Sequence, residues 1–112
     1  MARPISVGNA LVANTLTTVY TVPLGYFAKW TLMYAFNGTG STKHLTAYWF
    51  DSSTNTNIYF LNESTITSKE FIRIDGGAYV VLEEGDQVKV QSEAGSVIST
   101  ICTFELFKKE GI

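Results

Sequence analysis

The sequence has 112 residues, of which 46% are hydrophobic and only 16% are charged, and its net charge is −2. A chain of this length forms one domain with a sizeable core, because folding buries roughly two-thirds of its unfolded surface. Charged residues make up about a quarter of a typical soluble domain, so Thr, Ser and Asn must supply much of the polar surface here. The eight basic residues are scattered and form no stripe that would release counterions from a nucleic acid, so we expect no nucleic-acid partner.

The sequence also argues against a membrane span and against a disulfide-stapled fold. No stretch of about eighteen apolar residues occurs, and the N-terminus lacks a continuous hydrophobic segment, so we expect a soluble chain without a secretion signal. Cys102 is the only cysteine, which excludes an intrachain disulfide framework. It alternates with Phe104 and Leu106 and is therefore predicted to be a small buried hydrophobic side chain.

Residues 1–14 are predicted to form an extended N-terminal arm that contains one or two short strands. Pro4 and Gly8 interrupt any helix in this segment. A β-sandwich leaves open strand edges, which must be covered or paired, and an apolar arm is a suitable device for this. We therefore predict that the arm contacts or adds a strand to an adjacent subunit. Its candidate interface residues are Ile5, Val7, Leu11 and Val12.

Residues 15–107 are predicted to form the β-sandwich, and residues 108–112 a short charged tail. Turn residues such as Pro23 with Gly25, and Gly85 with Asp86, separate the predicted strands. These segments are rich in β-branched residues or alternate apolar with polar residues at a period of two. No segment has helical periodicity. The predicted strands are residues 15–22, 27–37, 44–52, 58–61, 71–74, 79–82, 87–91 and 97–107.

About eight strands without a helix predict an all-β fold in which two sheets bury each other's apolar faces. The spacing leaves jelly-roll and immunoglobulin-like connectivity open, although the lack of a Cys–Trp–Cys pattern excludes an antibody-type domain. In the longest strand, Met33 and Ala35 make the odd-numbered face partly apolar, as is typical of a central strand covered on both sides. The predicted apolar face consists of Ala28, Trp30, Leu32, Tyr34 and Phe36.

The titratable residues do not form a recognisable catalytic or metal-binding pattern. His44 is the only histidine, has no ligand at suitable spacing, and is predicted to face solvent at a strand start. Glu83, Glu84 and Asp86 are the densest acidic group. Clustered carboxylates suit calcium, but the EF-hand pattern is absent, and the segment is interpreted as a solvated hairpin turn. We therefore expect no catalytic residue, metal or cofactor.

The aromatic residues allow two interpretations. Five of them could build a platform for a sugar, namely Trp30, Trp49, Tyr48, Tyr59 and Tyr79. Trp30 and Trp49 lie on faces predicted to point inward, so a core role is favoured for both. Tyr48 and Phe50 are the stronger candidates for an exposed or interface patch.

Two segments resemble small β-sandwich virion proteins of tailed bacteriophages. Residues 18–25 (Thr-Val-Tyr-Thr-Val-Pro-Leu-Gly) match a Tyr-Thr-Val-Pro-x-Gly turn that leads into a strand in those proteins. Residues 77–90 are similar to their later hairpin, in which Leu-Glu-x-Gly-Asp joins two strands. The likeness extends over residues 15–107. It implies a homo-oligomer, for example a trimer, that contacts other phage structural proteins such as the major capsid or tail proteins within the virion.

These considerations predict a non-enzymatic structural protein of the virion, with capsid decoration as the first choice. A neck or tail component is the alternative within the same class. A carbohydrate- or receptor-binding sandwich is the alternative from another class, and it would require an exposed aromatic cluster beside polar residues. An enzyme is disfavoured, because one histidine and unpaired carboxylates give no catalytic spacing.

Overall fold

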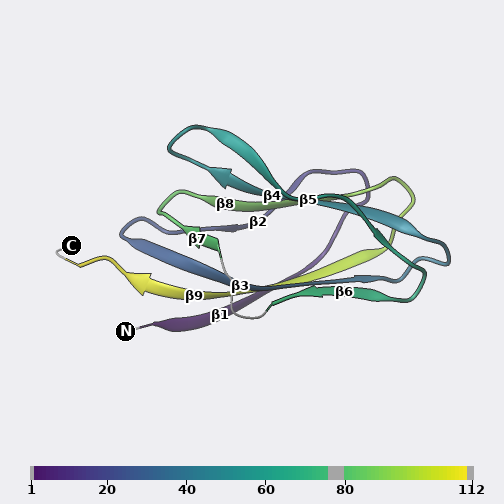
Figure 1. Ribbon diagram of the computed structural model, residues 1–112, viewed down its shortest axis with the longest axis horizontal. Helices are drawn as coiled ribbons and strands as arrows, with labels where there is room; N and C mark the ends of the chain where they lie inside the picture. Colours follow the sequence, from purple (N-terminus) through teal and green to yellow (C-terminus); the bar gives the residue numbers. More distant parts are fainter. Residues whose placement is uncertain (1, 76–79, 111–112) are drawn as a thin grey trace.

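The computed structural model describes residues 2–75 and 80–110, and in them the chain is all-β, as predicted (Figure 1). None of these residues forms a helix that is long and apolar enough to cross a membrane. The strands are β1 (Arg3–Ala10), β2 (Thr17–Thr21), β3 (Tyr26–Asn37), β4 (Lys43–Asp51), β5 (Thr56–Ile66), β6 (Phe71–Ile74), β7 (Val80–Leu82), β8 (Gln87–Ser92) and β9 (Ile98–Lys108).

The strands form two antiparallel sheets that pack face to face. One sheet has the order β1-β9-β3-β6, with β7 also paired to β3, and the other has the order β2-β8-β4-β5. In Figure 1 the four-stranded sheet lies above the five-stranded one. The central hairpin is β4–β5. Successive strand pairs enclose it along the chain and lie alternately in the two sheets, in the order β3 with β6 and β7, β2 with β8, and β1 with β9. This is jelly-roll connectivity, and it settles the choice that strand spacing left open.

Residues 3–10, predicted as part of the N-terminal arm, form β1. This strand pairs with β9 along its whole length, from Arg3 opposite Leu106 to Ala10 opposite Ser99. The segment is therefore an edge strand of the sandwich within its own chain, whereas the arm was predicted to pair with or contact an adjacent subunit. Its contact with an adjacent subunit stays a prediction.

A β-bulge in β3 corrects the predicted face of the longest strand. Trp30 lies opposite Phe104 and Leu32 lies opposite Thr103, so Thr31 is an extra residue on β3. One extra residue in a strand moves every later side chain of that strand to the opposite side of the sheet. Ala28 and Trp30 are accordingly buried, but beyond the bulge the buried residues are Met33, Ala35 and Asn37. The prediction that Leu32, Tyr34 and Phe36 share the core-facing side with Trp30 is therefore wrong.

The core lies between the sheets and is closed by aromatic side chains. Phe104 on β9 stacks on Tyr20 of β2, with ring centroids 4.4 Å apart, and Trp30 packs on Phe60 of β5 at 4.3 Å. Trp30 is 3% exposed, which confirms its predicted place in the core. Cys102 is also fully buried, and burial raises the pKa of its thiol to about 12. The thiol is therefore an inert packing group, as predicted.

Asp86 corrects the interpretation of the acidic hairpin as a solvated turn, because it is only 1% exposed. Its carboxylate accepts hydrogen bonds from the Trp49 indole (3.0 Å), the Ser52 amide (3.0 Å) and hydroxyl (2.9 Å), and the Glu83 amide (2.9 Å). Burial by itself raises the pKa of Asp86, but these donors outweigh it and hold the pKa below its usual value. The residue is therefore a buried anion that joins the β7–β8 turn to the end of β4.

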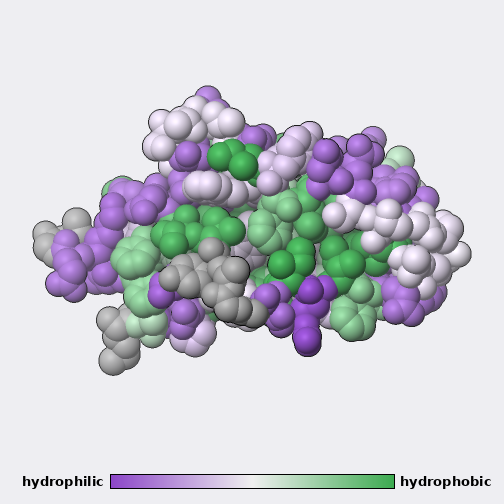
Figure 2. Space-filling view, viewed as in Figure 1, coloured by the Kyte–Doolittle hydropathy of each residue, from purple (hydrophilic) through white to green (hydrophobic). Residues whose placement is uncertain are grey.

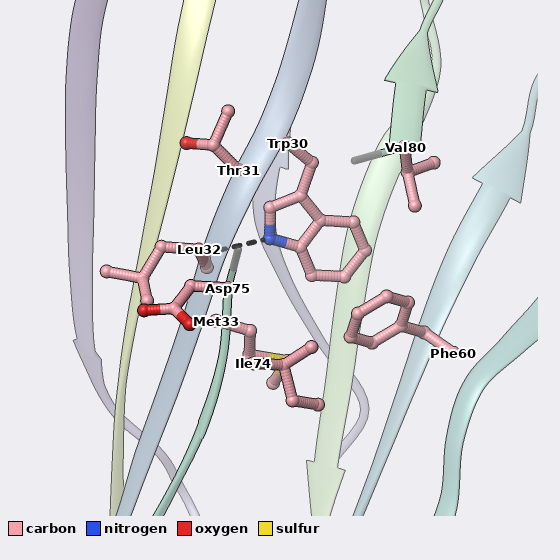
Figure 3. A pocket seen from close by; sticks show the side chains of 8 residues that line it. All are labelled: Trp30, Thr31, Leu32, Met33, Phe60, Ile74, Asp75 and Val80. Atoms are coloured by element: carbon pink, nitrogen blue, oxygen red, sulfur yellow. Dashed lines mark hydrogen bonds between the residues drawn. The ribbon is translucent and has the colours of Figure 1, made fainter. Parts of the chain in front are cut away.

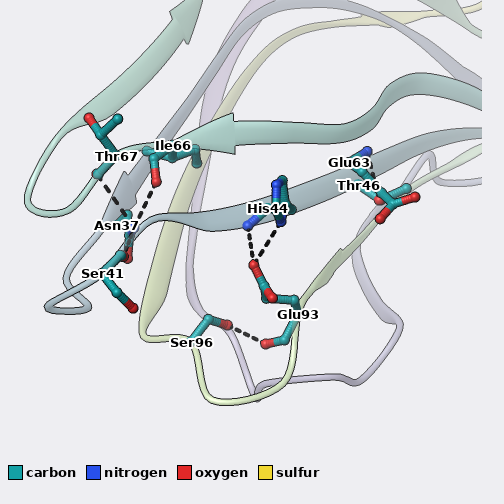
Figure 4. A network of polar contacts seen from close by, with 9 residues as sticks. All are labelled: Asn37, Ser41, His44, Thr46, Glu63, Ile66, Thr67, Glu93 and Ser96. Carbon is teal, nitrogen blue, oxygen red and sulfur yellow. Dashed lines mark hydrogen bonds and ion pairs between the residues drawn. The ribbon is translucent and has the colours of Figure 1, made fainter.

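Asn37 has a similar role at the other end of the molecule (Figure 4). Its side-chain amide donates to the carbonyl oxygens of Ser41 and Ile66, both at 2.9 Å, and its oxygen accepts from the Thr39 amide at 2.8 Å. The residue is fully buried. The glycine-containing loop after β3 is thus fastened by a polar side chain that satisfies its backbone groups.

The observed strand limits agree with the predicted ones to within a few residues, except in β5. This strand begins at Thr56 and ends at Ile66, whereas only residues 58–61 were predicted. Tyr79, predicted as the start of a strand, lies outside the described residues, as do the last two residues of the predicted tail. The first tail residue, Lys108, is the end of β9.

Candidate functional site

The outer side of the five-stranded sheet carries an unusual number of large apolar side chains. Phe71 is 52% exposed and Ile101 is 42% exposed, and the others are half-buried by their neighbours. We call this surface the apolar face. It comprises Phe27, Leu32, Tyr34, Phe36, Phe71, Ile101 and Phe107.

The apolar face exists because of the bulge at Thr31, which turns Leu32, Tyr34 and Phe36 away from the core. Tyr34 then stacks on Phe71 of β6, with ring centroids 5.2 Å apart. Each ring shields part of the other, but the pair stays on the outside of the sandwich. Single exposed apolar residues are ordinary, whereas several large apolar side chains on one side of a sheet suit an interaction site.

At the other end of the apolar face, Phe27 stacks on Phe107 with ring centroids 5.0 Å apart. The Lys29 ammonium lies 5.2 Å from the centre of the Phe107 ring. Lys29 is also opposite Glu105 on β9, and Arg73 lies opposite Tyr34, so the face carries charges of both signs. A face with both signs can be complementary to a second copy of itself.

The outer side of the five-stranded sheet, of which the apolar face is the part on β3, β6 and β9, approaches a protein interface in size. The sheet has four columns of strands, since β6 and β7 share one, and β9 spans 11 residues. At ~4.8 Å between strands and ~3.3 Å per residue, this whole side of the sheet measures roughly 700 Å². A stable interface takes about 800 Å² from each partner, so this sheet can supply most of one.

The outer side of the four-stranded sheet is different, because it is polar and contains a shallow depression of about 290 Å³. We call this the polar depression. Its floor is formed by β4, β5 and β8, and its rim includes Asn14 from the β1–β2 loop. It is lined by Asn14, His44, Thr46, Tyr48, Tyr59, Asn62, Glu63, Gln91, Ser92 and Glu93.

One rim of the polar depression is fixed by the contact between His44 and Glu93 (Figure 4). Glu93 Oε1 accepts from the His44 backbone amide at 2.7 Å and lies 2.9 Å from His44 Nδ1. The bond from the backbone amide, assisted by the imidazole, lowers the pKa of the Glu93 carboxyl. His44 is therefore only partly solvent-facing, and sequence reasoning missed this pair because the two residues are 49 positions apart.

A second hollow, of about 140 Å³, lies between the sheets beside the Trp30 side chain (Figure 3). Trp30 Nε1 donates to the Leu32 carbonyl at 3.1 Å, so the indole is already satisfied. Hydrophobic side chains gather along this side of the molecule in Figure 2. The hollow is smaller than the roughly 300 Å³ of a typical ligand site, and we assign it no ligand. It is lined by Trp30, Thr31, Leu32, Met33, Phe60, Ile74, Asp75 and Val80.

No three His, Cys, Asp or Glu side chains gather as a possible metal site in residues 2–75 and 80–110. Two carboxylates, Glu63 and Glu93, do line the polar depression. Trp49, whose exposure would have favoured sugar binding, is half-buried and bonded to Asp86.

The structure places the six predicted interface residues in three different environments. Ile5, Val7 and Leu11 pack against the core cluster of their own chain. Val12 is 68% exposed in the β1–β2 loop. Tyr48 and Phe50 lie on the outer side of the four-stranded sheet, where Tyr48 contacts Tyr59 and the Lys89 ammonium lies 4.4 Å from the centre of the Phe50 ring. The structure does not bring these six residues together.

No protein-family model matches the sequence, and no curated protein matches it either. Solved structures share the fold. A pilus subunit from the work "Bacillus endospore appendages form a novel family of disulfide-linked pili" has a TM-score of 0.57 and 14% identity, covering 96% of this chain and 87% of that one. The globular domain of zebrafish complement 1qA has a TM-score of 0.51 and 13% identity, and the match covers 97% of this chain and 100% of that domain. A chain of the cyanophage Pam1 capsid asymmetric unit has a TM-score of 0.50 and 15% identity, and the match covers 96% of this chain and 84% of that one.

These likenesses establish a shared β-sandwich fold and no more, because the identities are low. A structural β-domain is consistent with them. Two of the three structures are described as parts of assemblies, a pilus and a phage capsid.

Proposed function

We propose that this chain is a non-enzymatic structural subunit of a bacteriophage particle, and that it decorates the capsid by binding copies of itself and other virion proteins. The single observation that carries the proposal is the apolar face. A sheet in a solitary domain normally turns polar side chains to water, and the four-stranded sheet mostly does so, with Tyr48, Phe50 and Tyr59 as exceptions. The five-stranded sheet instead turns Ile101 and the stacks Tyr34–Phe71 and Phe27–Phe107 outward.

Two further observations support this role. The molecule is elongated, measuring 51 × 26 × 20 Å, and the apolar face runs along its length, which gives one broad surface for assembly. The resemblance to small phage virion proteins and the fold shared with a phage capsid chain favour a virion over a pilus. Its polar surface of Thr, Ser and Asn suits an outer layer of a particle.

The occupant that we propose for the apolar face is a second copy of the chain. Sedimentation velocity over a range of concentrations tests this, and the wild-type chain should associate. Ile101→Glu places a carboxylate in the centre of the buried surface, where an unpaired charge is costly. We expect it to weaken association by roughly tenfold or more, or ~1.4 kcal/mol.

The chain offers a closely matched control for this variant. Ile58 is 41% exposed, as against 42% for Ile101, but it lies on β5 in the opposite sheet. Ile58→Glu should associate as the wild-type chain does. A wild-type chain that stays monomeric, or equal loss of association in both variants, would contradict the proposal.

The location on the particle is tested separately by cosedimentation with purified capsids and with purified tails. Decoration predicts that the chain sediments with capsids and that Ile58→Glu does so equally well. Binding to tails alone would contradict capsid decoration and favour the neck or tail.

A further inference from the structure

We propose that the polar depression on the four-stranded sheet is a binding site for a neutral saccharide. This site lies on the opposite side of the sandwich from the apolar face, so the inference does not rest on the assembly proposed above. It combines an aromatic wall, amide side chains that have no partner among the residues that the structure describes, and a charge that excludes anions.

The aromatic wall consists of Tyr48 on β4 and Tyr59 on β5, which are directly opposite each other. Their ring centroids are 5.0 Å apart, and Tyr59 is 59% exposed. An exposed aromatic ring next to polar groups suits a sugar ring, because the C–H faces of a pyranose are apolar and its edges carry hydroxyls. The tyrosine hydroxyls can donate and accept as well.

The backbone of β5 is built in a way that keeps Tyr59 outside. Tyr48 pairs with Tyr59 while Ala47 pairs with Leu61, so Phe60 is an extra residue at a bulge. Phe60 turns inward onto Trp30 of the core, as Figure 3 shows. The adjacent tyrosine is thereby held on the outer side, because its neighbour is anchored in the core.

A second bulge places polar side chains beside this wall. Asn62 and Glu63 together lie opposite Thr46, and the Glu63 amide donates to the Thr46 hydroxyl at 3.1 Å. Glu63 adopts a positive φ of 51°, which is uncommon for this residue type. The two bulges in β5 therefore widen the strand at the point where the depression lies.

The polar groups of the depression are suited to hydroxyl recognition. Within the described part of the chain, the side-chain amides of Asn62 and Gln91 make no hydrogen bond to protein. An amide offers an acceptor and a donor side by side, and a pair of vicinal hydroxyls presents the complementary pattern. Glu93 is also preorganised, because both of its bonds to His44 end on Oε1, and Oε2 can accept from a ligand hydroxyl.

The charge and polarity of the depression make anionic and apolar ligands unfavourable. Its lining contains the carboxylates of Glu63 and Glu93 but no Lys or Arg, so phosphate, sulfate and nucleic acids are repelled. An apolar ligand would leave the amides and carboxylates desolvated without partners, which is costly. A neutral polyhydroxylated ring satisfies the aromatic wall and the polar rim together.

The proposal is tested with the full chain labelled with ¹⁵N. Glucose, galactose, mannose, N-acetylglucosamine and their short oligomers are titrated while amide chemical shifts are recorded. We expect at least one of these saccharides to bind, with shift changes centred on Tyr48, Tyr59 and Gln91. Inorganic phosphate serves as the anionic probe and should cause no change at these positions.

Variants then separate the aromatic wall from general effects on folding. Tyr59→Ala should weaken saccharide binding at least tenfold, whereas Tyr59→Phe, which keeps the ring, should retain most of it. Tyr34→Ala removes a tyrosine from the apolar face and should leave saccharide binding unchanged. Gln91→Ala should also weaken saccharide binding. It provides a second test of the same site if the Tyr59→Ala variant does not fold. The proposal is overturned if no saccharide binds, if binding survives Tyr59→Ala, or if the shifts map elsewhere.

Discussion

Replacing Asp86 by Asn tests whether a buried carboxylate fastens the β7–β8 turn to β4. The two side chains have nearly the same shape, so the change affects hydrogen bonding rather than packing. Asp86 Oδ1 accepts from the amide and hydroxyl of Ser52, and Oδ2 accepts from the Trp49 indole and the Glu83 amide. Asn offers one oxygen and one NH₂ group, so two of these donors would face another donor.

The expected loss follows from the number of donors left without an acceptor. An unsatisfied buried donor costs ~1–3 kcal/mol, and two of them cost roughly 2–6 kcal/mol. Relief from burying the charge of Asp86, which is 1% exposed, offsets part of this. We therefore expect Asp86→Asn to lower the free energy of unfolding by about 3 kcal/mol, a large share of the 5–15 kcal/mol typical of a domain.

The assay is urea unfolding at pH 7, followed by fluorescence of the two tryptophans. Asp51→Asn is the matched control, because among residues 2–75 and 80–110 Asp51 Oδ1 accepts only from the Ser53 amide and hydroxyl in an exposed turn. It should cost less than about 1 kcal/mol. The hydrogen bonds to Asp86 depress its pKa, so its contribution is present above the unfolded pKa and is lost as pH falls through the folded value. The reasoning fails if both variants lose the same stability or if Asp86→Asn loses less than about 0.5 kcal/mol.

Three further outcomes follow from individual contacts. Gly85→Ala should lower the free energy of unfolding by more than about 1 kcal/mol, because φ is +84° and a Cβ would lie 3.1 Å from Ser52 Oγ; unchanged urea midpoints would refute this. Glu93→Gln should destabilise the chain at pH 7 but not in acid, since the bonds from His44 depress the pKa of Glu93; a loss that persists below the unfolded pKa would contradict it. Cys102 should react with a thiol reagent only as fast as the chain unfolds, because its pKa is about 12 and it is fully buried; rapid labelling of the native chain would contradict this.

The sequence predicted the fold class because period-two alternation and turn residues are local signals. Strand limits at β6, β8 and β9 agree with the predictions within one or two residues, and the burial of Trp30 and Cys102 follows from the same alternation. Local signals say nothing about which strands pair, so the jelly-roll connectivity came only from the structure.

The apolar face was mispredicted, and of the polar depression only Tyr48 and Tyr59 were named in advance as possible sugar-binding residues, because both surfaces depend on β-bulges. The bulge at Thr31 moves Tyr34 and Phe36 outward, and the bulges in β5 aim Phe60 inward beside an exposed Tyr59. A usable signal was present, since Met33 and Ala35 made both faces of β3 apolar, which alternation alone does not explain. The position of a bulge is set by pairing with the neighbouring strand, and that is a tertiary property.

The central claim is that copies of this chain meet through the apolar face, and the distance between spin labels in the assembly tests it most directly. Ser99 lies on the outer side of β9 next to this face, whereas Ser53 lies in the β4–β5 turn of the opposite sheet. Each is replaced by Cys in turn and labelled, while the buried Cys102 stays unreactive. The account predicts a shorter distance between copies for labels at position 99 than for labels at position 53. A shorter distance at position 53, or no dipolar coupling between copies at position 99, would contradict it.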